Sequence, residues 1–108
     1  MHLTEPHALS RSGRFLDALK TLEAVAPTPA EKIEADVLRV HLFERVGEYP
    51  RSRYLAERLL RGRSLAPAFQ SDCRFALGLI DWDEGRFDRA LDHFQAALTL
   101  ARAGDDSF

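Results

Sequence analysis

The side chains best suited to catalysis or metal binding are scattered along this sequence of 108 residues. The histidines do not pair with a second histidine or a cysteine at the spacing of a metal site; they are His2, His7, His41 and His93. Asp81, Asp83 and Glu84 precede a glycine without the spacing of a calcium loop. No glycine-rich phosphate loop is present. We therefore expect no catalytic residue, no cofactor and no metal site, and hence not an enzyme.

Arginines gather in one segment, although the formal net charge of the chain is −2. A nucleic-acid site would use such side chains to neutralise phosphates. Glu57, however, lies four residues from both Arg53 and Arg61, the spacing of ion pairs within a helix. We expect a solvated helix face here, and contact with an acidic partner or with nucleic acid is a disfavoured alternative. The cluster comprises Arg51, Arg53, Arg58, Arg61 and Arg63.

Length and composition indicate one small domain. The apolar runs are far shorter than the roughly 20 residues that cross a membrane, so no membrane association is expected. The first residues lack the basic and apolar stretches of a secretory signal, which predicts a cytoplasmic protein. The single cysteine, Cys73, cannot form an internal disulfide and is expected to be a buried thiol.

An internal repeat is anchored by three glycines, Gly13, Gly47 and Gly85, which are 47 − 13 = 34 and 85 − 47 = 38 residues apart. An aromatic residue follows each glycine by two positions and a small residue follows by five. The aromatic residues are Phe15, Tyr49 and Phe87, and the small ones are Ala18, Ser52 and Ala90. Further apolar positions at offsets of nine and twelve complete one face of a helix after each glycine.

A second helix is expected before each glycine. The first is short, from Glu5 to Ser12 with Thr4 as its cap. The second begins at Thr28, where Thr28-Pro29-Ala30-Glu31 has the form of a capping box, and runs to Val46. The third opens near Pro67. The helices after the glycines are expected from Phe15 to about Val25, from about Pro50 to Arg61, and from Phe87 to Ala101.

The predicted fold is therefore all-α, an α-solenoid of about three antiparallel helix pairs with a short first helix. It would form a single domain over 1–108, with approximate repeats 1–26, 29–62 and 66–103. We call the first helix of each pair the leading helix and the second the trailing helix. A stack of about three pairs is near the minimum for stability. We expect the apolar flank of the last pair to be covered by a second copy or by further repeats.

The residues of the third pair resemble the tetratricopeptide repeat: Leu77-Gly78, then Gly85, Phe87, Ala90, Phe94 and Ala97. The resemblance implies that Gly78 and Ala90 let paired helices approach closely, and that Phe87 and Phe94 fill the layer between neighbouring pairs. Arg74 and Asp81 stand where large apolar residues are usual, so we expect their charges to reach solvent or each other. The segment ALTLARAGDD also resembles looser repeats of bacterial signalling and regulatory proteins.

The same resemblance implies a function, because such arrays hold a peptide or helix of a partner protein in the concave groove of their leading helices. Marginal additions from the first helix would be His7 and Arg11. With no asparagine, the chain lacks one residue type that some members of this family use to grip a terminal carboxylate, so an amphipathic segment is the expected ligand. The expected groove residues are Val37, His41, Glu44, Arg45, Phe75, Leu79, Trp82 and Asp83.

Two alternatives stay open at this point. The stripe of Phe75, Leu79 and Trp82 has the steps of four and three that place side chains on one helix face, so Trp82 is either a partner anchor or a packing residue. For the whole chain, the alternative to a groove or a piece of a longer scaffold is a regulatory segment of a bacterial signal-responsive regulator. Such a segment would bind a small effector or mask another domain.

Overall fold

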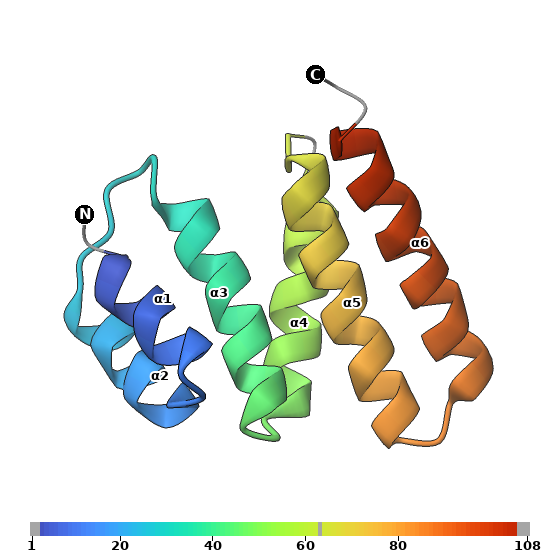
Figure 1. The fold of residues 1–108 in the computed structure, drawn as a ribbon, viewed down its shortest axis with the longest axis horizontal. Helices are drawn as coiled ribbons and strands as arrows, with labels where there is room; N and C mark the ends of the chain where they lie inside the picture. Colours follow the sequence, from blue (N-terminus) through green and yellow to red (C-terminus); the bar gives the residue numbers. More distant parts are fainter. Residues whose placement is uncertain (1–2, 63, 106–108) are drawn as a thin grey trace.

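A computed structural model describes residues 3–62 and 64–105, which form helices joined by short turns (Figure 1). No strand occurs in these two ranges, so the predicted all-α class is confirmed. The helices are α1 (Thr4–Arg11), α2 (Phe15–Ala24), α3 (Lys32–Arg45), α4 (Tyr49–Leu60), α5 (Pro67–Asp83) and α6 (Phe87–Asp105).

The helices form three hairpins that follow one another along the longest axis of the molecule, as Figure 1 shows. Within the hairpins α1 packs on α2, α3 on α4, and α5 on α6, while α2 contacts α3 and α4 contacts α5 between them. The leading helices α3 and α5 also contact each other directly. This succession of hairpins is the predicted α-solenoid arrangement, with a short first helix.

The three repeat glycines make the same turn between the helices of each hairpin. Gly13, Gly47 and Gly85 have φ angles of +81°, +83° and +81°, a left-handed conformation that side chains disfavour. Each glycine N–H donates to the carbonyl three residues earlier, over 3.0 to 3.1 Å. The next residue's N–H donates to the carbonyl five residues earlier, over 2.8 to 2.9 Å. This pair of bonds is a Schellman motif, which ends a helix and reverses the chain.

Two apolar layers hold the three hairpins together. The layer between the first and second hairpins contains Leu3, Ala18, Leu22, Ala35, Leu38 and Leu42. The layer between the second and third contains Val37, Val40, Ala56, Leu65, Cys73, Ala76 and Leu77. Cys73 is fully buried, as expected, and burial raises the pKa of its thiol to about 12. The thiol is therefore protonated and unreactive in the folded chain.

The small residues after each turn are fully buried: Ala18, Ser52 and Ala90. The Ser52 hydroxyl donates a hydrogen bond of 2.7 Å to the carbonyl of Val40. Gly78 accepts an aromatic ring, since a Cβ there would lie 2.5 Å from a ring carbon of Phe94. Phe94 thus packs inside the third hairpin, where it also contacts Phe75 with ring centroids 5.6 Å apart.

Some expected helix ends are displaced. The Thr28–Glu31 capping box forms, because the Thr28 N–H donates to Glu31 Oε1 over 3.1 Å and the Glu31 N–H donates to Thr28 Oγ1 over 3.3 Å. These bonds close a separate turn, however, and α3 begins after it at Lys32. Thr4 is the first residue of α1 and not its cap. The last helix extends beyond Ala101 to Asp105.

The expectation for Arg74 and Asp81 was incomplete. Asp81 is buried, and its carboxylate lies 3.1 Å from Arg86 Nε, 3.7 Å from Arg53 and 3.5 Å from His93 Nε2. Arg74 reaches the other nitrogen of the same His93 ring at 3.5 Å. Burial, aided by the charge of Arg74, lowers the pKa of His93, although Asp81 opposes this shift. The two charges are thus joined through a histidine, and a buried carboxylate needs such compensation.

Candidate partner-binding groove

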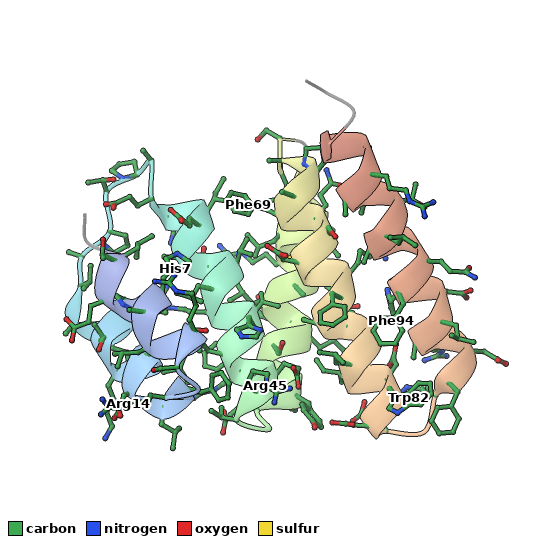
Figure 2. The ribbon with its side chains drawn as sticks, viewed as in Figure 1. His7, Arg14, Arg45, Phe69, Trp82 and Phe94 are labelled. Atoms are coloured by element: carbon green, nitrogen blue, oxygen red, sulfur yellow. The ribbon has the colours of Figure 1, made fainter. Side chains whose placement is uncertain are left out.

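A cavity of about 290 Å³ opens on the leading helices. Every residue that lines it belongs to α1, α3 or α5, and none belongs to a trailing helix. Figure 2 shows two lining residues on different helices, His7 on α1 and Phe69 near the start of α5. We call this cavity the groove; its lining is His7, Ser10, Glu34, Val37, Leu38, His41, Phe69, Asp72, Phe75, Ala76 and Leu79.

Four of the eight expected site residues line the groove: Val37, His41, Phe75 and Leu79. They come from two leading helices, and they lie there because steps of three and four residues keep them on one face of α3 and of α5. His7 lines the groove as well. Arg11 does not line the groove but lines a separate depression, whose lining also includes His7 and Glu34. Whether these residues bind a partner stays a prediction.

Glu44 and Arg45 lie near the last turn of α3, and neither lines the groove. Arg45 lies over the ring of Phe15, with its guanidinium carbon 5.3 Å from the ring centroid. Glu44 is only 5% exposed, and its Oε1 accepts no hydrogen bond, since the nearest Arg45 nitrogen is 3.7 Å away. Burial raises the pKa of Glu44; Arg45 opposes this shift, and the charge of Asp83 adds to it. Glu44 is therefore an electrostatically costly group.

Trp82 and Asp83 lie at the end of α5, also outside the groove lining. Trp82 is 50% exposed and forms a T-shaped ring pair with Phe87, with ring centroids 4.8 Å apart. Within the stripe of Phe75, Leu79 and Trp82, the first two residues therefore line the groove, whereas Trp82 packs against the first turn of α6. Asp83 accepts a hydrogen bond from the hydroxyl of Tyr49, which joins the second and third hairpins.

Sequence reasoning missed several groove residues, among them Glu34, Phe69 and Asp72. A signal for two of them was present in the repeat itself. Glu34 and Asp72 each precede a repeat glycine by thirteen positions, because 47 − 34 = 13 and 85 − 72 = 13. Equivalent positions of stacked repeats lie on the same face.

The polar side chains of the groove differ in their partners. His7 Nε2 lies 3.1 Å from Glu34 Oε1. The rings of His41 and Phe15 form a T-shaped pair, and burial, together with the charge of Arg45, lowers the pKa of His41. Burial by neighbouring groups raises the pKa of Asp72. No described residue forms a hydrogen bond or ion pair with Asp72, which leaves its carboxylate available to a ligand.

A second, more open hollow of about 390 Å³ lies on the flank formed by α5 and α6. Its lining is mainly apolar and includes Phe94 and Leu98. Phe75 and Asp72 line both this hollow and the groove, so the two share a wall. Nearby apolar side chains that are about half exposed are Trp82, Phe87, Leu91 and Leu98.

The arginine segment is partly occupied by protein contacts. Arg53 pairs with Glu84 and with Asp81, and not with Glu57 as its spacing had suggested. Arg51 lies 3.3 Å from Glu48 and over the ring of Phe43. Arg63, like His2, lies outside the described residues. Two of the five arginines, Arg51 and Arg53, are therefore engaged by acidic side chains of the protein itself.

Within the described part of the chain, no group of three or more histidine, cysteine, aspartate or glutamate side chains is placed to hold a metal ion. Across the same residues, no helix has both the length and the apolar character required to span a membrane.

No protein-family model matches the chain, and no solved structure matches it. A curated relative is the BBSome complex member BBS4 homolog of Drosophila melanogaster, which is 37% identical over 90 residues. The aligned region covers 82% of this chain but only 18% of the relative. The chain thus spans less than a fifth of the length of the curated protein it matches, and it is similar to one part of that protein.

Proposed function

We propose that this chain is a protein-interaction module whose groove holds a segment of a partner protein. The observation that carries the proposal is a cavity lined only by leading helices, with an apolar floor that includes Val37, Phe75 and Leu79. Apolar pockets of this kind receive the few anchor side chains that dominate many protein interfaces. At about 290 Å³ the groove has room for anchor side chains and not for a whole folded partner.

The similarity to a BBSome complex member supports a role within a multiprotein assembly, since that relative is described by its membership of a complex. We extend this to the present chain as part of the proposal, together with its assignment to the tetratricopeptide family. A binding role also fits a site whose lining offers no nucleophile paired with a base. No observation favours a bacterial regulatory segment, and the relative comes from an insect.

A peptide library displayed on phage tests the proposal. The whole chain would be the bait, and each selected peptide would be measured against Leu79→Ala and against Leu91→Ala. Both substitutions shorten a leucine on the third hairpin, but only Leu79 lines the groove. Thermal unfolding would establish that both variants are folded.

We expect selected peptides to lose about tenfold or more in affinity on Leu79→Ala, as for a residue that anchors a partner, and to tolerate Leu91→Ala. Peptides that respond to Leu91→Ala alone would place the binding surface on α6 and contradict the proposal. Failure to select any peptide sensitive to Leu79→Ala would also contradict it.

A further inference from the structure

The groove contains a repeated pairing of a histidine with an acid. His7 and His41 each precede a repeat glycine by six positions, since 13 − 7 = 6 and 47 − 41 = 6. Glu34 and Asp72 each precede the next repeat glycine by thirteen. The histidine of one leading helix is therefore matched with an acid on the following leading helix, first from α1 to α3 and then from α3 to α5.

The first of these pairs is closed. His7 Nε2 and Glu34 Oε1 are 3.1 Å apart, and both side chains line the groove. The contact bridges α1 and α3 and leaves each group with a partner. The first pair therefore shows that side chains at these two repeat positions can form a hydrogen bond between neighbouring leading helices.

The second pair is open. His41 and Asp72 both line the groove, yet no hydrogen bond or ion pair joins them in the described structure. His41 instead forms a T-shaped ring pair with Phe15, with ring centroids 6.0 Å apart. Asp72 faces the groove without a hydrogen-bonding partner. Asp72 is exposed at the edge of the groove, where its unpaired carboxylate can accept hydrogen bonds from a partner that brings positive charge and N–H donors.

The two groups of the open pair would both bind a ligand that donates hydrogen bonds. The lowered pKa of His41 favours a neutral ring, which has one nitrogen that accepts a hydrogen bond. A carboxylate accepts as well, so a group placed between them must donate to both. Ammonium and guanidinium groups do this, whereas a carboxylate or phosphate would be repelled by Asp72.

The other charged groups on α3 are of both signs. Glu34 lines the groove but is paired with His7, and Glu44 follows His41 by one helical turn, outside the groove lining, with an unsatisfied buried oxygen. Arg45 is the cation on α3 whose charge acts on His41; it lies outside the groove lining, with its guanidinium over the ring of Phe15 and 3.7 Å from Glu44 Oε1. The apolar side chains of Val37 and Leu79 can cover the aliphatic stem of a lysine or arginine.

We propose that the groove receives an arginine or lysine side chain of the partner segment, with the Asp72 carboxylate and the His41 imidazole as its hydrogen-bond acceptors and the apolar floor beneath its stem. The inference rests on the proposed function and specifies the partner: a segment that carries a basic residue next to an apolar anchor. It assigns Asp72 to the recognition of charge and Leu79 to apolar anchoring.

The same phage-displayed peptides test the inference. Among those sensitive to Leu79→Ala, we expect enrichment of arginine or lysine at one position beside a bulky apolar residue. Asp72→Asn should weaken these peptides by about tenfold or more, the effect expected for a hydrogen bond to a charged group. Replacing the basic residue of the peptide by glutamine should cause a similar loss, and the two changes together should cost little more than either alone.

Asp88→Asn is the matched control, because it removes the same charge from an exposed position on α6 outside the groove. It should leave affinity unchanged. Peptides that depend on Leu79 but lack basic residues, or that tolerate Asp72→Asn, would overturn this inference and leave the proposed function standing. The absence of any peptide dependent on Leu79 would overturn both.

Discussion

Replacing Gly47 by alanine isolates the energetic cost of one left-handed residue. Gly47 has a φ of +83°, and a Cβ built there meets no heavy atom within 4 Å. The alanine therefore introduces no clash, and it keeps the N–H that donates to the Glu44 carbonyl over 3.1 Å. What remains is the left-handed conformation, which costs a residue with a Cβ about 1–2 kcal/mol.

Part of this cost is offset in the unfolded chain. Alanine has fewer unfolded conformations than glycine, which is worth about 0.4–1 kcal/mol. We therefore expect Gly47→Ala to lower the free energy of unfolding by about 1 kcal/mol and the melting temperature by about 4 °C. Gly47→Asn should cost less, because asparagine tolerates the left-handed region. Gly13 and Gly85 have nearly the same φ and equally open surroundings, so their alanine variants should behave alike.

Urea unfolding followed by far-ultraviolet circular dichroism measures these differences, provided that the slope with denaturant is unchanged. A Gly47→Ala variant more stable than the original chain would refute the reasoning, because the left-handed conformation would then carry no net cost. A loss much greater at one of the three glycines would show that its turn carries contacts absent from the structure.

Further substitutions and reactions probe the interior. Gly78→Ala should destabilise the chain, since overpacking against the Phe94 ring costs about 1–3 kcal/mol and exceeds the roughly 1 kcal/mol gained in helix propensity. In a Phe94→Leu background the same change should stabilise the chain. A double-mutant cycle that finds no coupling between the two positions would contradict this. The Cys73 thiol, with a pKa of about 12, should not react with Ellman's reagent near pH 8 until the chain is unfolded; rapid labelling of the folded chain would contradict its burial. Folding raises the pKa of Glu44, so the folded chain loses stability as the pH rises from the unfolded-state pKa of this carboxyl through its folded-state pKa. Glu44→Gln should therefore be more stable than the original chain at neutral pH, and this advantage should shrink in acid; an unchanged gap in pH-dependent unfolding would contradict the assignment.

Helices and turns were predicted well because their causes are local. The spacing of Gly13, Gly47 and Gly85 identified the three turns, since a helix that ends in a left-handed residue favours glycine, which has no Cβ, at that point. Apolar residues at steps of three and four identified the faces that pack. The errors at Thr28 and Thr4 concern where a helix begins, which neighbouring turns change by a few residues.

The groove was only half predicted, since its membership depends on how neighbouring helices cross. The four residues that line the groove as predicted are Val37, His41, Phe75 and Leu79. Trp82 instead packs against Phe87, outside the groove lining. A helical stripe shows which side chains share a face. It does not show how far along that face the neighbouring helix remains close.

The sequence alone predicted the all-helical class, the three hairpins and the buried small residues that let the helices pack. Each of these features depends on periodicity and on turn residues that are close in sequence. The tertiary structure decided which residues far apart in sequence lie near one another: Asp81 contacts Arg53, the ring of Phe94 packs on Gly78, and His41 and Asp72 line one groove without a contact between them. These arrangements depend on the rotation and offset of one helix against another, which are set by the sum of many interfacial contacts and by no single segment.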